Sequence, residues 1–151
     1  MRERRGVGRT EVLIGATVIG VLGLIAVPLF MSVGKNSSRE EVPLVVESLR
    51  RAELFHFKQF GEYVAIESGP RAPTTVGSAS VPWKSNTGFD ALGWSPSTEG
   101  LTELYGSYRV SVTDSAFKVT GTCDVDGDGE RATFEATVDE EAKAVTPSTV
   151  Y

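Results

Sequence analysis

The sequence predicts an α+β fold, in which a long N-terminal helix packs on a small antiparallel β-sheet. Two observations support this fold class. Residues 12–34 carry no charged side chain and are mostly Val, Leu, Ile, Ala and Gly, which is typical of an apolar helix. Three stretches within residues 108–138 alternate between apolar and polar side chains, which is typical of strands with one buried face. A chain of 151 residues suits one small domain with a helical extension.

The apolar run from Val12 to Met31 has the length of a membrane-spanning helix, which needs about 20 apolar residues. A cleaved secretory signal has a shorter apolar core, of about 7–15 residues, followed by small residues at the cleavage site. No Ala-x-Ala site ends this run, and a helix of a soluble domain would have a polar face. We therefore predict that this run inserts into a membrane.

Basic residues on the two sides of the run predict its orientation. Arginines stand at positions 2, 4, 5 and 9, before the run, whereas only Lys35 and Arg39 follow it closely. By the positive-inside rule, the N-terminus stays in the cytoplasm and the rest of the chain lies across the membrane.

Glu11 directly precedes the apolar run. A carboxylate beside or within a bilayer is costly unless it has a partner, so Glu11 is a candidate functional residue. The alternative is that Glu11 only lies among the lipid headgroups.

Gly6 ends a short basic stretch, Glu11 stands five residues later, and Gly20 and Pro28 follow within the apolar run. This spacing over residues 6–28 resembles the N-terminal signature of type IV prepilins. In that family a short basic leader ends in Gly, a peptidase cuts after it, and the fifth mature residue is Glu. Cleavage after Gly6 would make Val7 the first mature residue and Glu11 the fifth. Gly20 and Pro28 then stand where the family has a helix Gly and a helix Pro.

Two features depart from the family pattern. The family usually begins its mature chain with Phe or Met, whereas this chain has Val7. Gly8 offers a second cleavage point, but cleavage there would leave Glu11 only third in the mature chain. We therefore expect cleavage between Gly6 and Val7.

The resemblance implies that residues 1–6 are a leader and residues 7–34 a transmembrane and assembly helix. It also implies N-methylation of Val7 and a structural role as a major or minor pilin in attachment or twitching motility. The implied partners are other pilins, the prepilin peptidase and the inner-membrane assembly platform. The implied location is the bacterial inner membrane, with a cytoplasmic N-terminus, and afterwards an extracellular filament.

The residues themselves suggest how such subunits would assemble. Cleavage would create an α-amino group on Val7, with an ordinary pKa of about 7.7–8.0, and this cation can pair with Glu11 of a neighbouring subunit. Either charge buried without the other would be strongly unfavourable, so the pair would set the register between subunits. Gly20 permits close helix packing, and Pro28 interrupts the helical hydrogen bonds, so we expect a locally melted turn there in the filament.

The sequence after the apolar run predicts an amphipathic helix over residues 35–61. Ser38 and Glu41 have the spacing of a capping box, which would start a new helix; alternatively, residues 34–38 are a polar part of one continuous helix. Gly61 is the expected end. The predicted inner face consists of Val42, Val45, Val46, Leu49, Ala52, Phe55 or His56, and Phe60.

Residues 62–151 predict a β-rich domain. Up to Glu103 the pattern is that of a loop, held by its large apolar side chains Trp83, Phe89, Leu92 and Trp94. Three strands with period-two alternation then follow, over residues 108–113, 117–122 and 132–138. Residues 142–146 predict a short edge strand.

One segment of this domain has the spacing of a calcium loop. Asp124, Asp126 and Asp128, followed by Gly129 and Glu135, match D-x-D-x-D-G-x5-E. The candidate calcium ligands are Asp124, Asp126, Asp128, Glu130 and Glu135. Strands flank this segment where an EF-hand has helices, so the alternative is a polar hairpin tip in which Asp and Gly only shape the turn.

The remaining composition excludes several classes of function. No nucleophile–base–acid set, phosphate loop or dinucleotide motif is present in the sequence, so we do not expect an enzyme. Removal of the leader, with net charge +2, would change the net charge from −5 to −7, which disfavours nucleic-acid binding. Cys123 is the sole cysteine, so no intrachain disulfide forms, and the sole histidine, His56, is expected to be structural.

Three functional hypotheses remain open from the sequence. The preferred one is a subunit of a type IV pilus. The second is a pseudopilin of a type II secretion system. The third is an unrelated protein with a single membrane helix that presents a calcium-dependent binding module.

Overall fold

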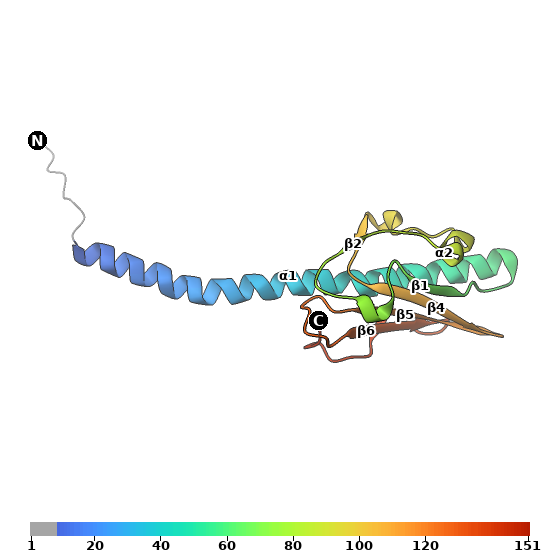
Figure 1. The fold of residues 1–151 in the computed structure, drawn as a ribbon. Coiled ribbons are helices and arrows are strands. Elements are labelled where there is room, and N and C mark those ends of the chain that lie inside the picture. Colours follow the sequence, from blue (N-terminus) through green and yellow to red (C-terminus); the bar gives the residue numbers. More distant parts are fainter. Residues whose placement is uncertain (1–8) are drawn as a thin grey trace, which may run out of the picture. The chain divides into compact units, whose positions relative to one another are not determined.

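A computed structural model describes the backbone of residues 9–151 and the side chains of Thr17 and residues 34–151. The chain divides into the units Met1–Gly34 and Lys35–Tyr151, and the second unit is called the head below. Helix α1, Arg9–Phe60, is the first element (Figure 1). The polar residues 34–38 lie within this helix, so they do not start a new one.

An antiparallel sheet forms one layer of the head. Within the described residues its strand order is β1-β4-β5-β6-β7. The central strands are β4 (Ser107–Thr113), β5 (Ala116–Cys123) and β6 (Ala132–Thr137), and each pairs with the next along the chain. The edge strands are β1 (Ile66–Gly69) and β7 (Lys143–Ala144).

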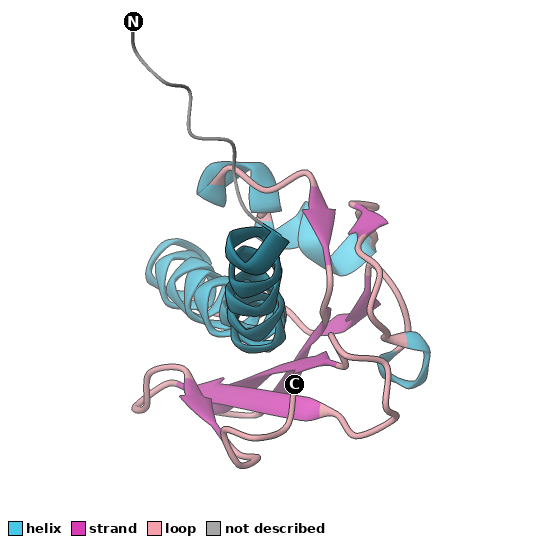
Figure 2. Cartoon of the chain, turned by 90° about the vertical axis from the view of Figure 1, so that its left-hand side faces the viewer, coloured by secondary structure: helices cyan, strands magenta, loops and turns pink. Residues whose placement is uncertain are grey.

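The part of α1 that belongs to the head lies against one face of this sheet (Figure 2). Val42, Val45, Val46 and Leu49 are fully buried and follow helical spacing along one side of α1. The sheet contributes its inward set, which consists of Ile66, Tyr108, Val110, Phe117, Val119, Cys123, Ala132, Phe134 and Ala136. The predicted α+β arrangement of a helix on an antiparallel sheet is confirmed.

The inner face of α1 differs from the prediction beyond Leu49. Phe55 and Phe60 are 63% and 66% exposed, so their assignment to the inner face was wrong, whereas His56, the alternative to Phe55, is partly buried. The helical phase set by Val42 and Leu49 carries the buried side to Glu53 instead, which is fully buried. The buried side of the helix therefore includes a carboxyl group where the sequence pattern suggested an aromatic ring.

The region up to Glu103 is not a plain loop, as the sequence had suggested. It contains β1, which joins the main sheet, and helix α2 (Thr87–Leu92), which begins at the N-cap Asn86. Its other elements are short: the 3-10 turns Pro73–Thr75 and Pro96–Glu99, and the paired strands β2 (Val81–Pro82) and β3 (Glu103–Leu104). Side-chain capping by Asn86, which accepts from the backbone N–H groups of Gly88 and Phe89, is the local signal for α2.

The aromatic residues of this region hold it on α1, as the sequence predicted. Trp83 lies 4.8 Å from Phe89 and 5.5 Å from Trp94, measured between ring centroids. The indole N–H of Trp94 donates to the Ser48 hydroxyl on α1 at 2.9 Å. α1 is therefore covered both by the sheet and by residues 83–104.

Candidate functional site

The predicted processing and assembly residues lie largely beyond what the structure describes. Gly6 and Val7 lie outside the described residues. Glu11, Gly20 and Pro28 belong to α1, but their side chains are not described. In the part of the chain that is described, none of the helices combines the length and apolar character needed to span a membrane. The side chains of the apolar run are not in that part, Thr17 excepted.

The predicted calcium loop lies directly after β5 in the head. Asp124 is buried, Asp126 is partly buried and Asp128 is exposed. Each offers a carboxylate oxygen, and these oxygens all lie within 4.8 Å of one another. The fold thus brings the first acidic members of the motif together.

Asp124 shapes this loop through hydrogen bonds to its backbone. Its Oδ1 accepts from the Gly127 N–H at 2.7 Å, and its Oδ2 accepts from the Gly129 N–H at 3.2 Å. Gly127 and Gly129 have φ values of 73° and 90°, a left-handed conformation that glycine adopts without steric cost. The same geometry is typical of a hairpin tip without metal, so these bonds alone do not distinguish the two interpretations.

Asp126 is the residue that favours a cation. Its Oδ2 lies 3.5 Å from the Lys35 ammonium, and its side chain is 15% exposed. Its Oδ1 is buried and has no hydrogen-bond partner among the described residues. A buried oxygen without a partner is costly, and a hard cation shared with Asp124 and Asp128 would satisfy it.

The glutamates of the predicted motif lie elsewhere. Glu130 is exposed, and its backbone N–H donates to Asp128 Oδ1 at 2.8 Å. Glu135 lies on β6, where its carboxylate pairs with Lys118 of β5 at 2.9 Å. Because β6 runs away from the loop as an extended strand, it does not return Glu135 to the aspartates as an EF-hand helix would. A cation here would need backbone carbonyls or water as its further ligands.

Two glutamates on α1, the partly buried Glu41 and the fully buried Glu53, have contacts that the sequence analysis did not predict. The Glu41 carboxylate accepts from the backbone N–H groups of Tyr105 and Gly106, at 3.0 and 3.3 Å, and from the Tyr108 hydroxyl at 2.7 Å. Burial raises the pKa of Glu41, and these hydrogen bonds and the nearby Arg71 partly oppose the rise. Burial likewise raises the pKa of Tyr108 well above its ordinary value. The sequence assigned Glu41 to a capping box, whereas in the structure it ties β4 to α1.

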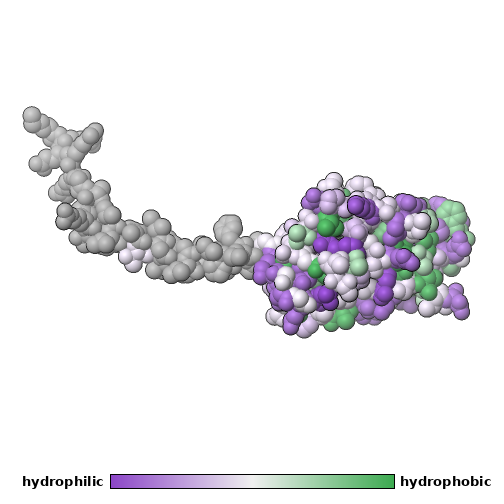
Figure 3. Space-filling model, in the orientation of Figure 1, coloured by the Kyte–Doolittle hydropathy of each residue, from purple (hydrophilic) through white to green (hydrophobic). Residues whose placement is uncertain are grey.

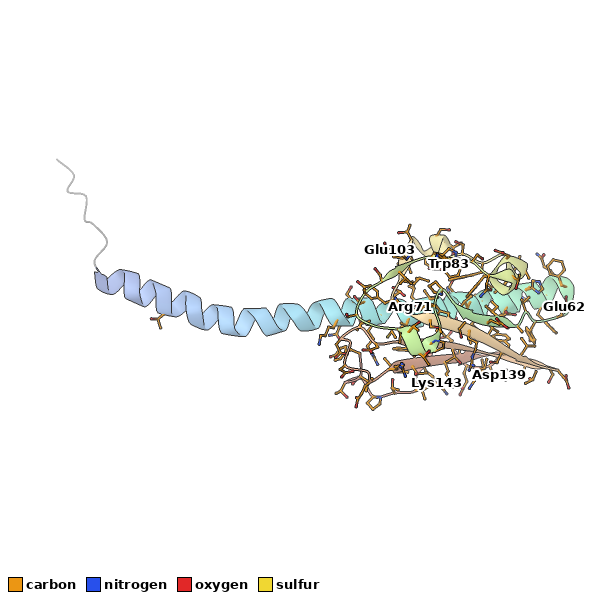
Figure 4. All side chains as sticks on the ribbon, in the orientation of Figure 1. Glu62, Arg71, Trp83, Glu103, Asp139 and Lys143 are labelled. Carbon is orange, nitrogen blue, oxygen red and sulfur yellow. The ribbon has the colours of Figure 1, made fainter. Side chains whose placement is uncertain are left out.

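Arg71 supports the same corner of the head (Figure 4). Its guanidinium donates to the carbonyl groups of Ala79 and Leu104, at 2.7 and 2.9 Å. Its own carbonyl accepts from the Ser107 hydroxyl at 2.7 Å. These contacts hold the connection between β3 and β4 in place, which in turn presents its N–H groups to Glu41.

Glu53 is fully buried on α1. Its Oε2 accepts from the Val64 N–H at 3.0 Å, and its Oε1 is buried with no hydrogen-bond partner among the described residues. Burial raises its pKa to about 7, although the bond from Val64 and the nearby His56 act in the opposite direction. Glu53 follows Leu49 by four positions, so helical spacing alone could have identified it as an inward residue.

The single cysteine is a core residue. Cys123 is fully buried, and desolvation raises its thiol pKa to about 12. The thiolate is therefore scarce at neutral pH, which is typical of a packing role.

Comparisons with protein-family models, with curated proteins and with solved structures gave no significant match for this chain.

Proposed function

We propose that this chain is a structural subunit of a type IV pilus, made as a prepilin and assembled through its N-terminal helix. The spacing of Gly6, Glu11, Gly20 and Pro28 carries the proposal. A long helix that continues into a small α+β head, where it packs on an antiparallel sheet, supports it. The role is mechanical rather than catalytic.

The assembly step depends on charge neutralisation. Cleavage after Gly6 leaves a cationic amine on Val7, which meets the Glu11 carboxylate of an adjacent subunit among apolar helices. Because each charge would be costly to bury alone, subunits join only in the register that pairs them. The peptidase therefore controls assembly by creating one half of the pair.

A calcium site in the head is the second candidate function, and the buried Oδ1 of Asp126 favours it. A cation between β5 and β6 would hold the loop after Cys123, in a chain whose single cysteine forms no intrachain disulfide. Such a site is compatible with a pilus subunit, with a secretion pseudopilin, and with a calcium-dependent binding module on one membrane helix.

The mass of the mature protein tests the main proposal. We expect protein purified from its host membrane or filaments to begin at Val7 and to carry one added methyl group. A Gly6→Val variant should keep the leader and should not enter filaments. Functional protein that retains residues 1–6 would refute the proposal, because Glu11 would then have no amine to pair with.

A further inference from the structure

The outward side of α1 carries two exposed apolar residues. Leu44 is 47% exposed and Phe55 is 63% exposed, on the side opposite Val45 and Leu49. Phe55 follows Leu44 by 11 positions, which is close to three helical turns, so both project in nearly the same direction. At the end of α1, further apolar residues gather on the surface, as green atoms at the right of Figure 3.

The outward side of α1 also carries charged residues, which are acidic at one end and basic at the other. We call Glu40, Leu44, Arg51, Phe55 and Lys58 the outer stripe, since helical spacing places them along one line. Within the described part of the chain, no ion pair involves Glu40 or Lys58. Arg51 is 74% exposed and pairs with Glu47 of its own helix at 3.3 Å. The stripe is acidic where it begins and basic where it ends.

The outer stripe is complementary to itself when two parallel copies are displaced by 11 residues. Glu40 of one copy then stands opposite Arg51 of the other, and Leu44 stands opposite Phe55. Glu47, at the edge of the stripe, stands opposite Lys58. The displacement is about 16 Å, at a rise of about 1.5 Å per residue. Without displacement, like charges would meet at each of the four charged positions, Glu40, Glu47, Arg51 and Lys58.

A groove on the stripe fits the same arrangement. Arg51, Leu54, Phe55 and Lys58 line an open groove of about 260 Å³ on the surface of α1. Its floor is apolar and its rim is basic. Leu44 of a displaced copy would enter this groove as a knob enters a hole between helices, with Glu40 beside the basic rim.

We propose that the outer stripe is a contact between copies of this chain, in which parallel α1 helices are displaced by 11 residues. The start and the end of the outer stripe are different surfaces. Each copy therefore contacts one neighbour through the start of its stripe and another neighbour through the end. Such a contact repeats from copy to copy without closing into a ring, as in a filament. An antiparallel pair would also match the charges, but copies anchored in one membrane run parallel. The inference therefore rests on the proposed pilus function and names the contact that the head makes in it.

Cysteine cross-linking in the full-length protein tests this contact. Leu44→Cys with Phe55→Cys should give a ladder of oligomers on mild oxidation of filaments. Leu44→Cys with Phe60→Cys is the matched control, because Phe60 is equally exposed but projects from the other side of α1. Cys123 is buried and remains in all variants, so filaments of the unmodified protein should give no covalently cross-linked oligomers.

Each outcome of the cross-linking has one meaning. A cross-linked dimer without higher oligomers would indicate a closed pair and would overturn the inference. Filaments that form normally but give no ladder would also overturn it, while leaving the proposed function intact. Protein that keeps its leader and forms no filaments would refute the proposed function itself.

Charge exchange provides an independent measurement. Glu40→Arg and Arg51→Glu should each lower filament yield by roughly two- to fivefold per contact, since each places like charges opposite one another. The double variant should restore the yield, because it exchanges the two signs. A double variant that is as weak as the single variants would contradict the predicted pairing.

Discussion

The Tyr108 hydroxyl donates a 2.7 Å hydrogen bond to the Glu41 carboxylate, and this bond joins β4 to α1 in the core of the head. Tyr108→Phe would keep the ring packing but leave the partly buried Glu41 carboxylate with only its backbone donors. We expect the free energy of unfolding to fall by about 1–3 kcal/mol, measured by denaturation of the full-length protein in detergent. Tyr105→Phe is the matched control, because Tyr105 contacts Glu41 through its backbone N–H. An equal loss in both variants would contradict this role of the hydroxyl.

Gly121 allows α1 to approach the sheet closely. A Cβ at this position would lie 2.5 Å from Val46 Cγ2 and 2.7 Å from Val42 Cγ1. Gly121→Ala should therefore force the helix from the sheet and lower stability by about 1–3 kcal/mol in the same denaturation experiment. Gly77→Ala, where a Cβ meets nothing within 4 Å, should change stability by less than about 0.5 kcal/mol.

Glu53 makes the stability of the head depend on pH. Its pKa is about 7 in the folded state, against an ordinary value of 4.5, so the folded state binds more protons between these values. The contribution of Glu53 to the free energy of unfolding is therefore greatest below pH 4.5. It falls as the pH rises from 4.5 through 7, by up to about 3 kcal/mol.

Glu53→Gln should remove this dependence, because glutamine stays neutral and keeps an acceptor for the Val64 N–H. We expect its thermal midpoint to exceed that of the unmodified protein at pH 8 and to match it more closely at pH 5. Glu62→Gln, at an exposed position nearby, should leave the pH profile unchanged. If the thermal midpoint of Glu53→Gln depended on pH as that of the unmodified protein does, another group would be responsible for the pH dependence.

Calcium binding in the loop after β5 is tested by titration calorimetry on the full-length protein. We expect saturable binding in the micromolar to millimolar range, and its loss in Asp126→Asn, which removes charge at the buried Oδ1. Glu135→Gln should bind normally, because that carboxylate pairs with Lys118 and lies apart from the aspartates. Absence of heat up to millimolar calcium would leave the loop as a hairpin tip.

Glu11→Ala tests the proposed assembly pair. The variant should still insert into the membrane and lose its leader, but its filament yield should fall more than about tenfold, since an unpaired buried charge costs about 3–5 kcal/mol. Glu3→Ala is the control, because Glu3 would be removed with the leader. Normal filaments from Glu11→Ala would contradict the pairing with the Val7 amine.

Much of the head could be predicted because burial on one face leaves a periodic pattern. The strands over residues 108–113, 117–122 and 132–137 follow the predicted alternation, and residues 143–144 form the predicted edge strand. β1 was missed because Ile66–Gly69 is too short to show a period and contains a glycine. Such a short segment becomes a strand only when β4 supplies its hydrogen-bond partners.

The candidate calcium site could also be predicted only in part from the sequence. Local spacing alone predicted Asp124, Asp126 and Asp128 as one cluster, since residues of one tight loop remain close in any fold. Glu135 would join the aspartates only if a helix followed the loop. In the structure β6 follows it and pairs with β5, so Glu135 forms an ion pair with Lys118 instead.

The sequence by itself determined the fold class, the buried side of α1 as far as Leu49, and the spacing on which the prepilin resemblance rests. Only the tertiary structure decided which partners the carboxylates of α1 have, because Glu41 and Glu53 accept from backbone donors of distant segments, at Tyr105 and Val64. A periodic pattern records which side of a helix faces inward. It does not record which polar groups the rest of the chain brings to that side, and these partners decide whether a buried charge is tolerated.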